Sequence, residues 1–288
     1  MRFISVIEDK KYLLWQQEIQ FRHMKERGFE CISVILYEDS ISDYALELSK
    51  IGKVFFFKND SPVKRYVPSN KAWGLYKLLQ LDPDFGKDFT LIDSDVLCFS
   101  FPRVTPGMNS AADCDSYLGY NYLRQHLTDE QITYVSEGIT TLEKIKDMKG
   151  SGAQYYFHNI TSQDCYEVAI NSDKIYKKVK EMEINHGSKI QVWTAEMWAW
   201  LWTIGSKDTI HITPELDFSW ATSRLEEQPR KKFLHLAGVT GKDMGIFYKG
   251  LYTSSTPWED RNIEYIKNRD NCGWLYYLEL CRLKGLTP

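Results

Sequence analysis

Apolar and polar residues alternate in blocks along the first hundred positions. Short apolar runs that are typical of strands are separated by segments in which apolar residues recur every three or four positions, as in amphipathic helices. The strands expected from this pattern are 2–7, 31–37, 53–58 and 89–92, and the expected helices are 12–27, 45–51 and 70–81. Alternation at this interval predicts βαβ units, so we expect an α/β fold with a mainly parallel central sheet flanked by helices.

The alternation weakens beyond residue 100, which predicts a mixed C-terminal part. Expected strands there are 153–157 and 232–236, and expected helices are 128–149, 172–183, 192–204 and an aromatic helix in the tail around 274–280. No internal repeat or low-complexity linker divides the chain. We therefore expect one domain over residues 1–288.

Composition and charge exclude several classes of protein. Hydrophobic residues make up 43% and charged residues 26% of the 288 residues, as in ordinary globular proteins rather than disordered or fibrous ones. Lys and Arg total 36 against 39 Asp and Glu, so the formal charge is −3. Because there is no basic excess, we expect neither a nucleic acid nor an anionic membrane surface as a partner.

The sequence also lacks the usual marks of membrane and secreted proteins. No stretch approaches the ~18 apolar residues of a membrane helix, and residues 1–7 do not resemble a signal peptide. The six cysteines are scattered without a C-x-x-C pair, which favours reduced thiols and a reducing compartment. We therefore expect a soluble, cytoplasmic protein without a membrane span.

The segment most informative about chemistry is 89–97, in which an apolar run leads into Asp93-Ser94-Asp95. Ligands of open α/β sheets collect at the carboxyl ends of strands, and alternation along a strand would direct both carboxylates to one side. Two such groups suit a hard cation such as Mg²⁺ or Mn²⁺, which can in turn hold a diphosphate. The alternative is an ordinary strand-ending turn, in which Asp and Ser are favoured.

A second segment supplies a candidate third ligand. His235 leaves the apolar run 232–236 and is followed by Gly238, Gly241 and Lys242. The imidazole could bind a metal, the glycines could let the backbone approach phosphates, and Lys242 could neutralise phosphate charge. A histidine after a strand is by itself more often structural, so the prediction of a metal–diphosphate site depends on the combination with the two aspartates.

A third segment, 193–202, is rich in tryptophan and carries one carboxylate. On a helix Trp193, Met197 and Trp200 share a face, and Glu196 lies beside it. A carboxylate among indoles is partly desolvated, a condition that often marks functional groups. The alternative is an aromatic core helix in which Glu196 forms an ion pair.

Taken in order, these three segments resemble metal-dependent glycosyltransferases of the GT-A type. More narrowly, the chain is similar to the plant and algal hydroxyproline O-arabinosyltransferase and peptidyl-serine galactosyltransferase group. The local matches are Trp15-Gln16-Gln17-Glu18 to that group's W-Q element, Asn70-Lys71-Ala72-Trp73 to its N-R-P-W element, and Trp193-x-x-Glu196-Met197-x-Ala199-Trp200 to its W-x-x-E-M helix. Ala72 replaces the proline of the second element. Those enzymes are membrane-anchored in the secretory pathway, whereas a soluble microbial or viral relative, in the host cytoplasm if viral, is expected here.

The resemblance implies a Rossmann-like GT-A fold and metal-dependent transfer of a sugar from a UDP-sugar to a glycan or glycoprotein acceptor, with retention. Residues 1–100 would form the nucleotide-binding half, and residues 101–288 the acceptor-binding half with a C-terminal metal and phosphate segment. The implied metal ligands, for Mn²⁺ or Mg²⁺, are Asp93, Asp95 and His235, and the implied catalytic residues are Asp95 and Glu196. The other expected donor contacts are Ser5, Ile7, Glu8, Asn70, Lys71, Ser94, Gln154, Gly238 and Lys242.

Three other classes share parts of this pattern. Phosphatases of the haloacid-dehalogenase type also place D-x-D after an apolar strand, but near the N-terminus and with Thr or Val where Leu97 stands. Sugar-phosphate nucleotidyltransferases carry an N-terminal glycine-rich loop, and residues 1–15 contain no glycine. A non-catalytic carbohydrate-binding protein could use the aromatic residues for sugars and the carboxylates for a structural Ca²⁺. Only the glycosyltransferase hypothesis uses all three segments.

Overall fold

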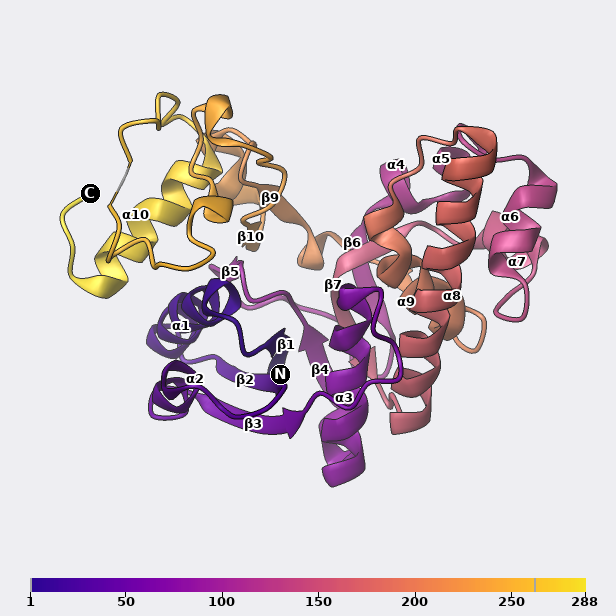
Figure 1. Ribbon diagram of the computed structural model, residues 1–288, viewed down its shortest axis with the longest axis horizontal. Helices are drawn as coiled ribbons and strands as arrows, with labels where there is room; N and C mark the ends of the chain where they lie inside the picture. The colour runs from indigo at the N-terminus through magenta and orange to yellow at the C-terminus, as the bar shows by residue number, and fades with distance from the viewer. Residues whose placement is uncertain (1, 262) are drawn as a thin grey trace. The chain divides into compact units, whose positions relative to one another are not determined.

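A computed structural model describes residues 2–261 and 263–288 of the chain, and Figure 1 labels its helices and strands. The chain forms two compact units, each assembled from segments that are far apart in the sequence. Unit 1 consists of Met1–Lys58, Ile92–Arg103 and Glu215–Pro288, and unit 2 of Asn59–Leu91 and Val104–Pro214.

A parallel sheet forms the core of unit 1. Its strands are β1 (Arg2–Glu8), β2 (Glu30–Tyr37) and β3 (Lys53–Lys58), in the order β3-β2-β1. The register pairs Ile4 with Ile32 and Val34 with Phe55. Strands of a parallel sheet are covered on both faces and therefore read as continuous apolar runs, which is why the sequence pattern located all three.

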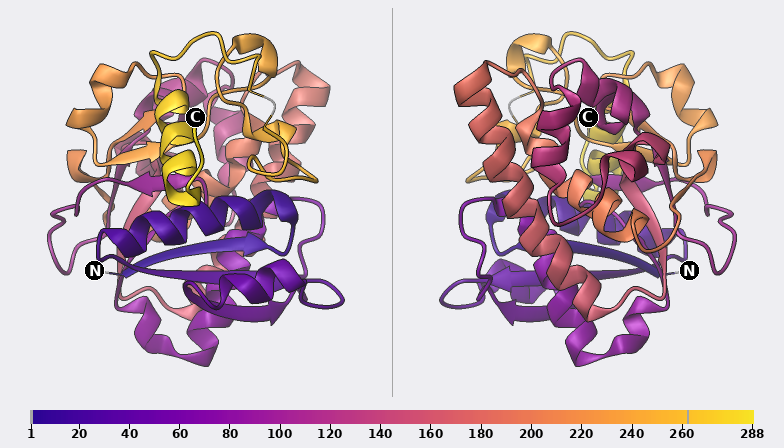
Figure 2. Two further views of the ribbon diagram at one scale, coloured as in Figure 1. Left: turned by 90° about the vertical axis from the view of Figure 1, so that its left-hand side faces the viewer. Right: turned by 90° about the vertical axis from the view of Figure 1, so that its right-hand side faces the viewer.

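Helix α1 (Lys11–Glu26) lies between this sheet and a helix from the far end of the chain, α10 (Cys272–Lys284). The left view of Figure 2 shows α10 lying across α1, with the parallel strands on the other side of α1. Trp15 and Ile19 of α1 share a buried cluster with Tyr276 and Tyr277 of α10. The short helix α2 (Asp43–Leu48) also packs on α1, and its N-cap Ser42 accepts a hydrogen bond from the Ala45 amide.

A small second sheet completes unit 1. It consists of β5 (Val96–Cys98), β10 (Phe233–His235) and β9 (Phe218–Trp220), with β10 antiparallel to β5 and parallel to β9. The sequence pattern predicted β10, which lies within the expected strand 232–236, but neither of its partners. Short 3-10 turns of this unit are η5 (Leu225–Arg230), η6 (Lys242–Met244) and η7 (Lys249–Leu251).

Unit 2 contains a mixed sheet of four strands. They are β4 (Asp88–Leu91), β7 (Ser151–His158), β6 (Ser110–Asp113) and β8 (His211–Ile212), in the order β4-β7-β6-β8. β7 is antiparallel to both neighbours, and its register with β6 shifts between Ala111 and Ala112. Opposite that shift Ala153 has a φ of 59°, an uncommon conformation for a residue other than glycine.

Three long helices accompany this sheet: α3 (Asn70–Leu81), α8 (Ser162–His186) and α9 (Ala195–Gly205). α8 packs on both α3 and α9, and α9 packs on β7, where the Trp200 ring lies 5.0 Å from that of Phe157. The remaining helical segments are α4 (Asp115–Leu118), α5 (Tyr120–Arg124), α6 (Asp129–Ser136), α7 (Leu142–Asp147), η1 (Val67–Ser69), η2 (Pro83–Gly86), η3 (Val192–Thr194) and η4 (Pro214–Leu216).

The predicted α/β class is confirmed, with the parallel strands in unit 1 and a mixed sheet in unit 2. The expected helix over 128–149 is instead two helices, α6 and α7, because Gly138 adopts a φ of 75° between them. The expected helix over 172–183 is the middle of the much longer α8, which begins with a capping box at Thr161.

Two further expectations concern cysteines and membrane segments. All six cysteines are free and buried. Within residues 2–261 and 263–288, no helix combines the length and the apolar character needed to cross a membrane.

Candidate functional site

Asp93, Asp95 and His235 form an acidic cluster in unit 1. One ligand atom from each lies within 4.8 Å of the others. His235 Nε2 is 3.3 Å from Asp95 Oδ1 and 3.6 Å from Asp93 Oδ2. Asp95 and His235 are buried, whereas the Asp93 side chain is 32% exposed, so the cluster opens to solvent on the Asp93 side.

Backbone pairing brings the histidine to the aspartates. In the small sheet His235 lies opposite Val96, the residue after Asp95, and the Leu236 amide donates to the Asp95 carbonyl at 3.1 Å. The sequence analysis argued from alternation along a strand, but the Asp93-Ser94-Asp95 segment is not part of a strand. It is a turn closed by a 3.1 Å hydrogen bond from the Val96 amide to the Asp93 carbonyl, so the turn and the site are the same structure.

A buried chain of amide side chains supports this turn from α1. Gln20 donates to the carbonyls of Asp93 and Val96, at 2.7 and 2.9 Å. Gln17 donates to Gln20 Oε1 at 3.0 Å and accepts the Ser5 hydroxyl hydrogen at 2.6 Å. Ser5 is fully buried, so its hydroxyl serves this network instead of facing the surface where a donor contact was expected.

Lys249, which the sequence analysis did not single out, forms an ion pair with Asp95. Burial acts to raise the pKa of the Asp95 carboxyl, but Lys249 and His235 outweigh it and hold that pKa well below its ordinary value. The pKa of Lys249 is raised: burial opposes its charge, and the charge of Asp95 more than compensates. The two groups are therefore a charged pair at neutral pH. Lys249 lies 154 residues from Asp95 in the chain, so only the fold reveals the pair.

The donor set fits a divalent cation. Two carboxylates and an imidazole are ligands that Mn²⁺ and Mg²⁺ accept, and ligand atoms on one such ion lie about 3 Å apart. His235 Nδ1 is buried without a hydrogen-bond partner among the described residues. The Tyr276 hydroxyl is likewise buried and unpartnered within the described part of the chain; burial raises its pKa, and the charge of Asp95 raises it further. These two polar atoms are therefore buried without a hydrogen-bond partner among the described residues.

The other predicted contacts of unit 1 do not all reach this cluster. Ile7 is buried, and Glu8 at the end of β1 pairs with Lys10 at 3.0 Å. Ser94 is buried inside the turn, between the two aspartates.

Two predicted residues follow β10. Gly238 has a φ of 87°, so a glycine is required where the chain leaves the sheet after His235. Lys242 is exposed on η6, and the lysine that reaches the acidic cluster is Lys249 instead.

Unit 2 contains a second group of predicted residues around Glu196. The carboxylate is only 4% exposed; its Oε1 accepts a 2.6 Å hydrogen bond from Trp200 Nε1, and Lys71 Nζ lies 3.4 Å away. Tyr66 joins the start of α9, since its hydroxyl donates to the Trp193 carbonyl and accepts from the Glu196 amide. Glu196 therefore forms the ion pair that the alternative interpretation predicted. The pair can be reached by solvent from the Lys71 side, because the Lys71 side chain is 19% exposed.

Trp193 does not share the buried face of α9 that the helical spacing predicted. It lies in the preceding turn η3 and is 56% exposed, whereas Met197 and Trp200 are buried. Helix α9 begins only at Ala195. The prediction that Trp193 shares a helical face with Met197 and Trp200 was therefore wrong for Trp193.

Asn70 and Gln154 of unit 2 are both buried. Asn70 Oδ1 and both polar atoms of the Gln154 amide lack partners among the residues described. Gln154 follows Ala153, at the irregular pairing between β7 and β6. Buried amides without partners are costly, typically by about 1–3 kcal/mol per group.

Comparison with known proteins gives structural but no sequence relatives. No protein-family model matches the chain, and neither does any curated protein sequence. Among solved structures, the chain is similar to mouse xyloside xylosyltransferase 1 in its apo form, with a TM-score of 0.42 and 11% identity over 81% of this chain and 96% of that one. It is also similar to an active-site mutant of LgtC (TM-score 0.49, 12% identity, 100% and 98% covered). The third is the galactosyltransferase LgtC with donor and acceptor sugar analogues (TM-score 0.48, 11% identity, 100% and 97% covered).

All three of these structures are glycosyltransferases. Their TM-scores lie below 0.5, so the functional conclusion rests on the acidic cluster and not on this likeness.

Proposed function

We propose that this protein is a metal-dependent glycosyltransferase of the GT-A type, related to the hydroxyproline O-arabinosyltransferase and peptidyl-serine galactosyltransferase group. It would move a sugar from a UDP-sugar to a glycan or glycoprotein acceptor with retention. The observation that carries the proposal is the Asp93, Asp95 and His235 cluster, which draws on two segments far apart in the sequence and turns His235 Nε2 toward both carboxylates.

A Mn²⁺ or Mg²⁺ ion bound to these three residues would stabilise the negative charge that develops on a departing diphosphate. The protein's own contribution is to hold the ligands still. Gln20 fixes the Asp93–Val96 turn through two carbonyls, so the carboxylates need little rearrangement when charge develops. Lys249 adds a positive charge at the buried side of the cluster, where low polarity strengthens its effect.

Glu196 and Lys71 are proposed to serve the transferred sugar or the acceptor. A carboxylate held by an indole N–H can accept hydrogen bonds from sugar hydroxyls, because each oxygen keeps a further lone pair. Its negative charge would also favour an oxocarbenium-like centre. Asn70 and Gln154, which have unused amide groups, are further candidates for contacts with hydroxyls.

The metal assignment is tested with Asp95→Ala and Asp95→Asn. UDP-, GDP- and dTDP-linked sugars are incubated with the protein in Mn²⁺ or in EDTA. Release of the free nucleoside diphosphate is measured, and the thermal midpoint is recorded under the same conditions. We expect metal-dependent release with a UDP-sugar and a loss of about 10²–10³-fold in both variants. The control Asp217→Asn, which removes an ion-paired carboxylate elsewhere in unit 1, should retain activity. Wild-type turnover by Asp95→Ala with Mn²⁺ would contradict the assignment.

Parallel assays, one with a nucleoside triphosphate and a sugar 1-phosphate and one of sugar binding alone, separate the alternatives. A sugar-phosphate nucleotidyltransferase would release pyrophosphate from a nucleoside triphosphate, and a carbohydrate-binding protein would bind sugars without turnover. Where a product forms, the anomeric configuration of the transferred sugar, read by NMR, decides between retention and inversion.

The role of Glu196 is tested with Glu196→Gln. The amide keeps the shape and can still accept from Trp200, but the negative charge is lost, so kcat should fall about 10²-fold while the thermal midpoint changes little. The control Asp164→Asn removes a carboxylate paired with Lys207 in the same unit and should leave kcat unchanged. A variant with reduced stability and normal kcat would make Glu196 a structural residue.

A further inference from the structure

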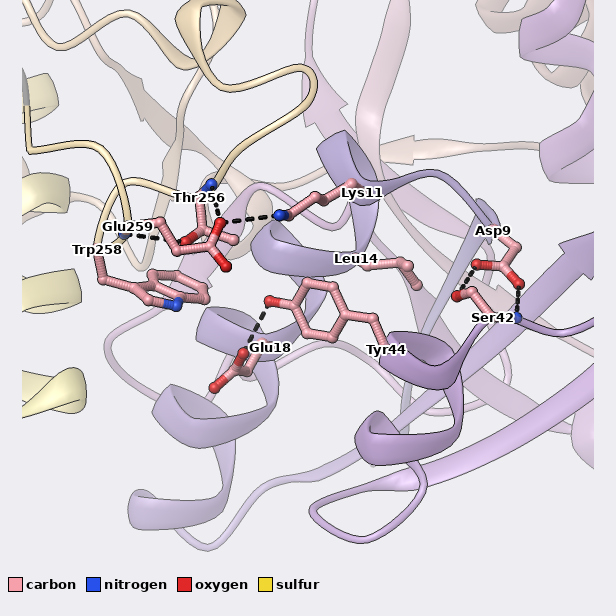
Figure 3. A pocket seen from close by; sticks show the side chains of 9 residues that line it. All are labelled: Asp9, Lys11, Leu14, Glu18, Ser42, Tyr44, Thr256, Trp258 and Glu259. Carbon is pink, nitrogen blue, oxygen red and sulfur yellow. Dashed lines mark hydrogen bonds and ion pairs between the residues drawn. The ribbon is translucent and has the colours of Figure 1, made fainter.

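Unit 1 contains a cavity that includes none of the residues of the acidic cluster. Its volume is about 460 Å³, within the range of sites for small ligands, about 300–1,000 Å³. It is bounded by the start of α1, the start of α2 and a segment that precedes α10, as Figure 3 shows. The groups that matter for a ligand are two aromatic rings, Tyr44 and Trp258, and three carboxylates, Asp9, Glu18 and Glu259.

Two aromatic side chains from different elements enclose this space. Tyr44 projects from α2 and Trp258 from the C-terminal segment, and Figure 3 shows both rings beside the Glu18 carboxylate. Each ring is held in position. The Tyr44 hydroxyl donates to Glu18 at 2.8 Å, and Lys284 Nζ lies 4.0 Å from the centroid of the Trp258 ring.

The three carboxylates of the lining already have donors. Asp9 accepts from the Ser42 amide and hydroxyl at 2.7 and 2.5 Å. Glu259 pairs with Lys11 at 2.8 Å and accepts from the Thr256 amide at 3.1 Å.

Glu18 is the most buried of the three carboxylates and has the most donors. It accepts from Lys284 at 2.7 Å and from Arg22 at 2.9 Å, in addition to Tyr44. Burial acts to raise the pKa of Glu18, but these donors lower it below its ordinary value, so the group is ionised at neutral pH. Two of the three lining carboxylates, Glu18 and Glu259, therefore have their charge balanced by Lys or Arg, whereas Asp9 accepts from two neutral donors of Ser42.

This chemistry favours one class of ligand over ionic ones. An ionic ligand at Glu18 or Glu259 would have to compete with the ion pairs that these carboxylates already form, at a cost in desolvation. A sugar needs no such exchange, because its hydroxyls can use the spare lone pairs of paired carboxylates and its C–H faces can pack on aromatic rings. We infer that this cavity binds a carbohydrate of one or two sugar units between Tyr44 and Trp258, as a site separate from the proposed site of transfer.

The inference is tested by binding in EDTA without nucleotide, so that the outcome does not depend on metal-dependent transfer. Glucose, galactose, lactose, cellobiose, maltose and chitobiose, together with glycopeptides that carry the same sugars, are titrated by calorimetry. Inorganic phosphate and an arginine-rich peptide serve as ionic probes. Trp258→Ala and Tyr44→Ala should weaken sugar binding by about tenfold or more, since each removes a stacking surface.

Conservative variants keep the test sharp if the alanine variants fold poorly. Trp258→Tyr and Tyr44→Phe preserve a ring and should retain binding within a few-fold, with an unchanged thermal midpoint. The control Tyr134→Ala removes an exposed ring in unit 2 and should have no effect. Free sugars that bind as well as the glycopeptides would identify the sugar alone as the ligand, whereas tighter glycopeptide binding would identify a glycosylated acceptor.

Three results would overturn the inference. These are no binding of any sugar or glycopeptide at millimolar concentration, sugar binding that Trp258→Ala leaves intact, or binding of the ionic probes alone. Loss of transfer in Asp95→Ala together with intact sugar binding would leave both proposals standing, and loss of sugar binding alone would affect only this one.

Discussion

Asp95 shows at the scale of single residues how one carboxylate can have two uses. Its oxygens face His235 on one side and Lys249 on the other. In the absence of a cation, Lys249 balances the buried charge of Asp95. A metal ion bound at the cluster would face competition from that lysine for the same carboxylate.

Replacement of Lys249 should therefore change metal binding in a specific direction. In Lys249→Met we expect a lower thermal midpoint without metal, because Asp95 loses its partner, and a Mn²⁺ affinity about tenfold higher, equivalent to about 1.4 kcal/mol. Calorimetric titration with Mn²⁺ in the absence of nucleotide measures this affinity. Lys50→Met, at an exposed surface pair, is the control. Unchanged or weaker Mn²⁺ binding in Lys249→Met would contradict the competition.

A second buried carboxylate makes stability depend on pH. Glu279 of α10 accepts hydrogen bonds from Arg282 at 2.8 Å and contacts His23 of α1 at 2.7 Å. Burial acts to raise the pKa of Glu279, but these partners outweigh it and lower the pKa far below its ordinary value. The folded state thus binds fewer protons, and the stabilisation is complete above the unfolded pKa of about 4.3 and is lost as the pH falls below it.

Glu279→Gln should lower the free energy of unfolding by about 1–3 kcal/mol at pH 7. The difference from the wild type should shrink as the pH falls below about 4, because Glu279 of the unfolded chain then takes up a proton while the folded carboxyl is still ionised, which favours unfolding of the wild type. Urea unfolding at a series of pH values measures both effects. Glu47→Gln, at an exposed pair with Lys50, should show neither. A pH-independent difference would assign the effect to packing instead of charge.

The residues of the candidate site were predictable to different degrees. Asp93 and Asp95 were visible because an apolar run leads straight into them, and His235 because it ends another such run. Lys249 was not visible, since it stands in an irregular segment without periodicity and meets Asp95 only through the fold. Ser5 was expected as a donor contact at the first strand, but its hydroxyl is buried and donates to Gln17.

At the scale of elements, hydrophobic periodicity and helix capping decide which helices and strands can be located from the sequence. Apolar strands such as β2 and regular helices such as α3 were located closely. β5 and β9 were missed, whereas β10, which is equally short, was located because it lies within the apolar run 232–236. α9 was located, but its start was placed too early, since the residues of η3 continue the same apolar pattern in a different backbone conformation.

Close backbone contact makes one glycine essential to an element of unit 2. A Cβ on Gly86 would lie 2.0 Å from the Ile160 carbonyl oxygen, and the Gly86 carbonyl itself accepts from the Ile160 amide. Gly86→Ala must therefore displace backbone and should destabilise the protein by more than about 2 kcal/mol. Chemical denaturation measures the change.

Gly205→Ala is the matched control for Gly86→Ala. There the nearest neighbour of a new Cβ, at the end of α9, would be the flexible Met148 side chain, 3.2 Å away, and Leu201 at 3.8 Å would be in ordinary contact. Its effect should stay within about 1 kcal/mol, because helix propensity offsets the contact. Wild-type stability of Gly86→Ala would show that η2 and the segment after β7 can move apart at little cost.

At the scale of the whole molecule, the class of fold followed from the sequence and the division of the chain did not. Strand–helix alternation predicted α/β architecture. Which segments belong to which unit, however, is decided by contacts between distant parts of the chain, such as those of Trp15 with the buried residues of α10. No local sequence pattern predicts such contacts. The Glu196 group and the acidic cluster were likewise found as separate sequence motifs, and each is built within one unit.

The packing of the C-terminal segments on α1 also determines when unit 1 can fold during synthesis. The Trp15 indole donates to the Tyr252 carbonyl at 3.2 Å, across 237 positions of the chain. A ribosome that adds about 5–20 residues per second needs roughly 10–50 s to make that stretch. For that time the apolar face of α1 has no native cover and is open to chaperones that bind apolar nascent chains. The rate of translation, rather than any local propensity, then sets the earliest moment at which unit 1 closes.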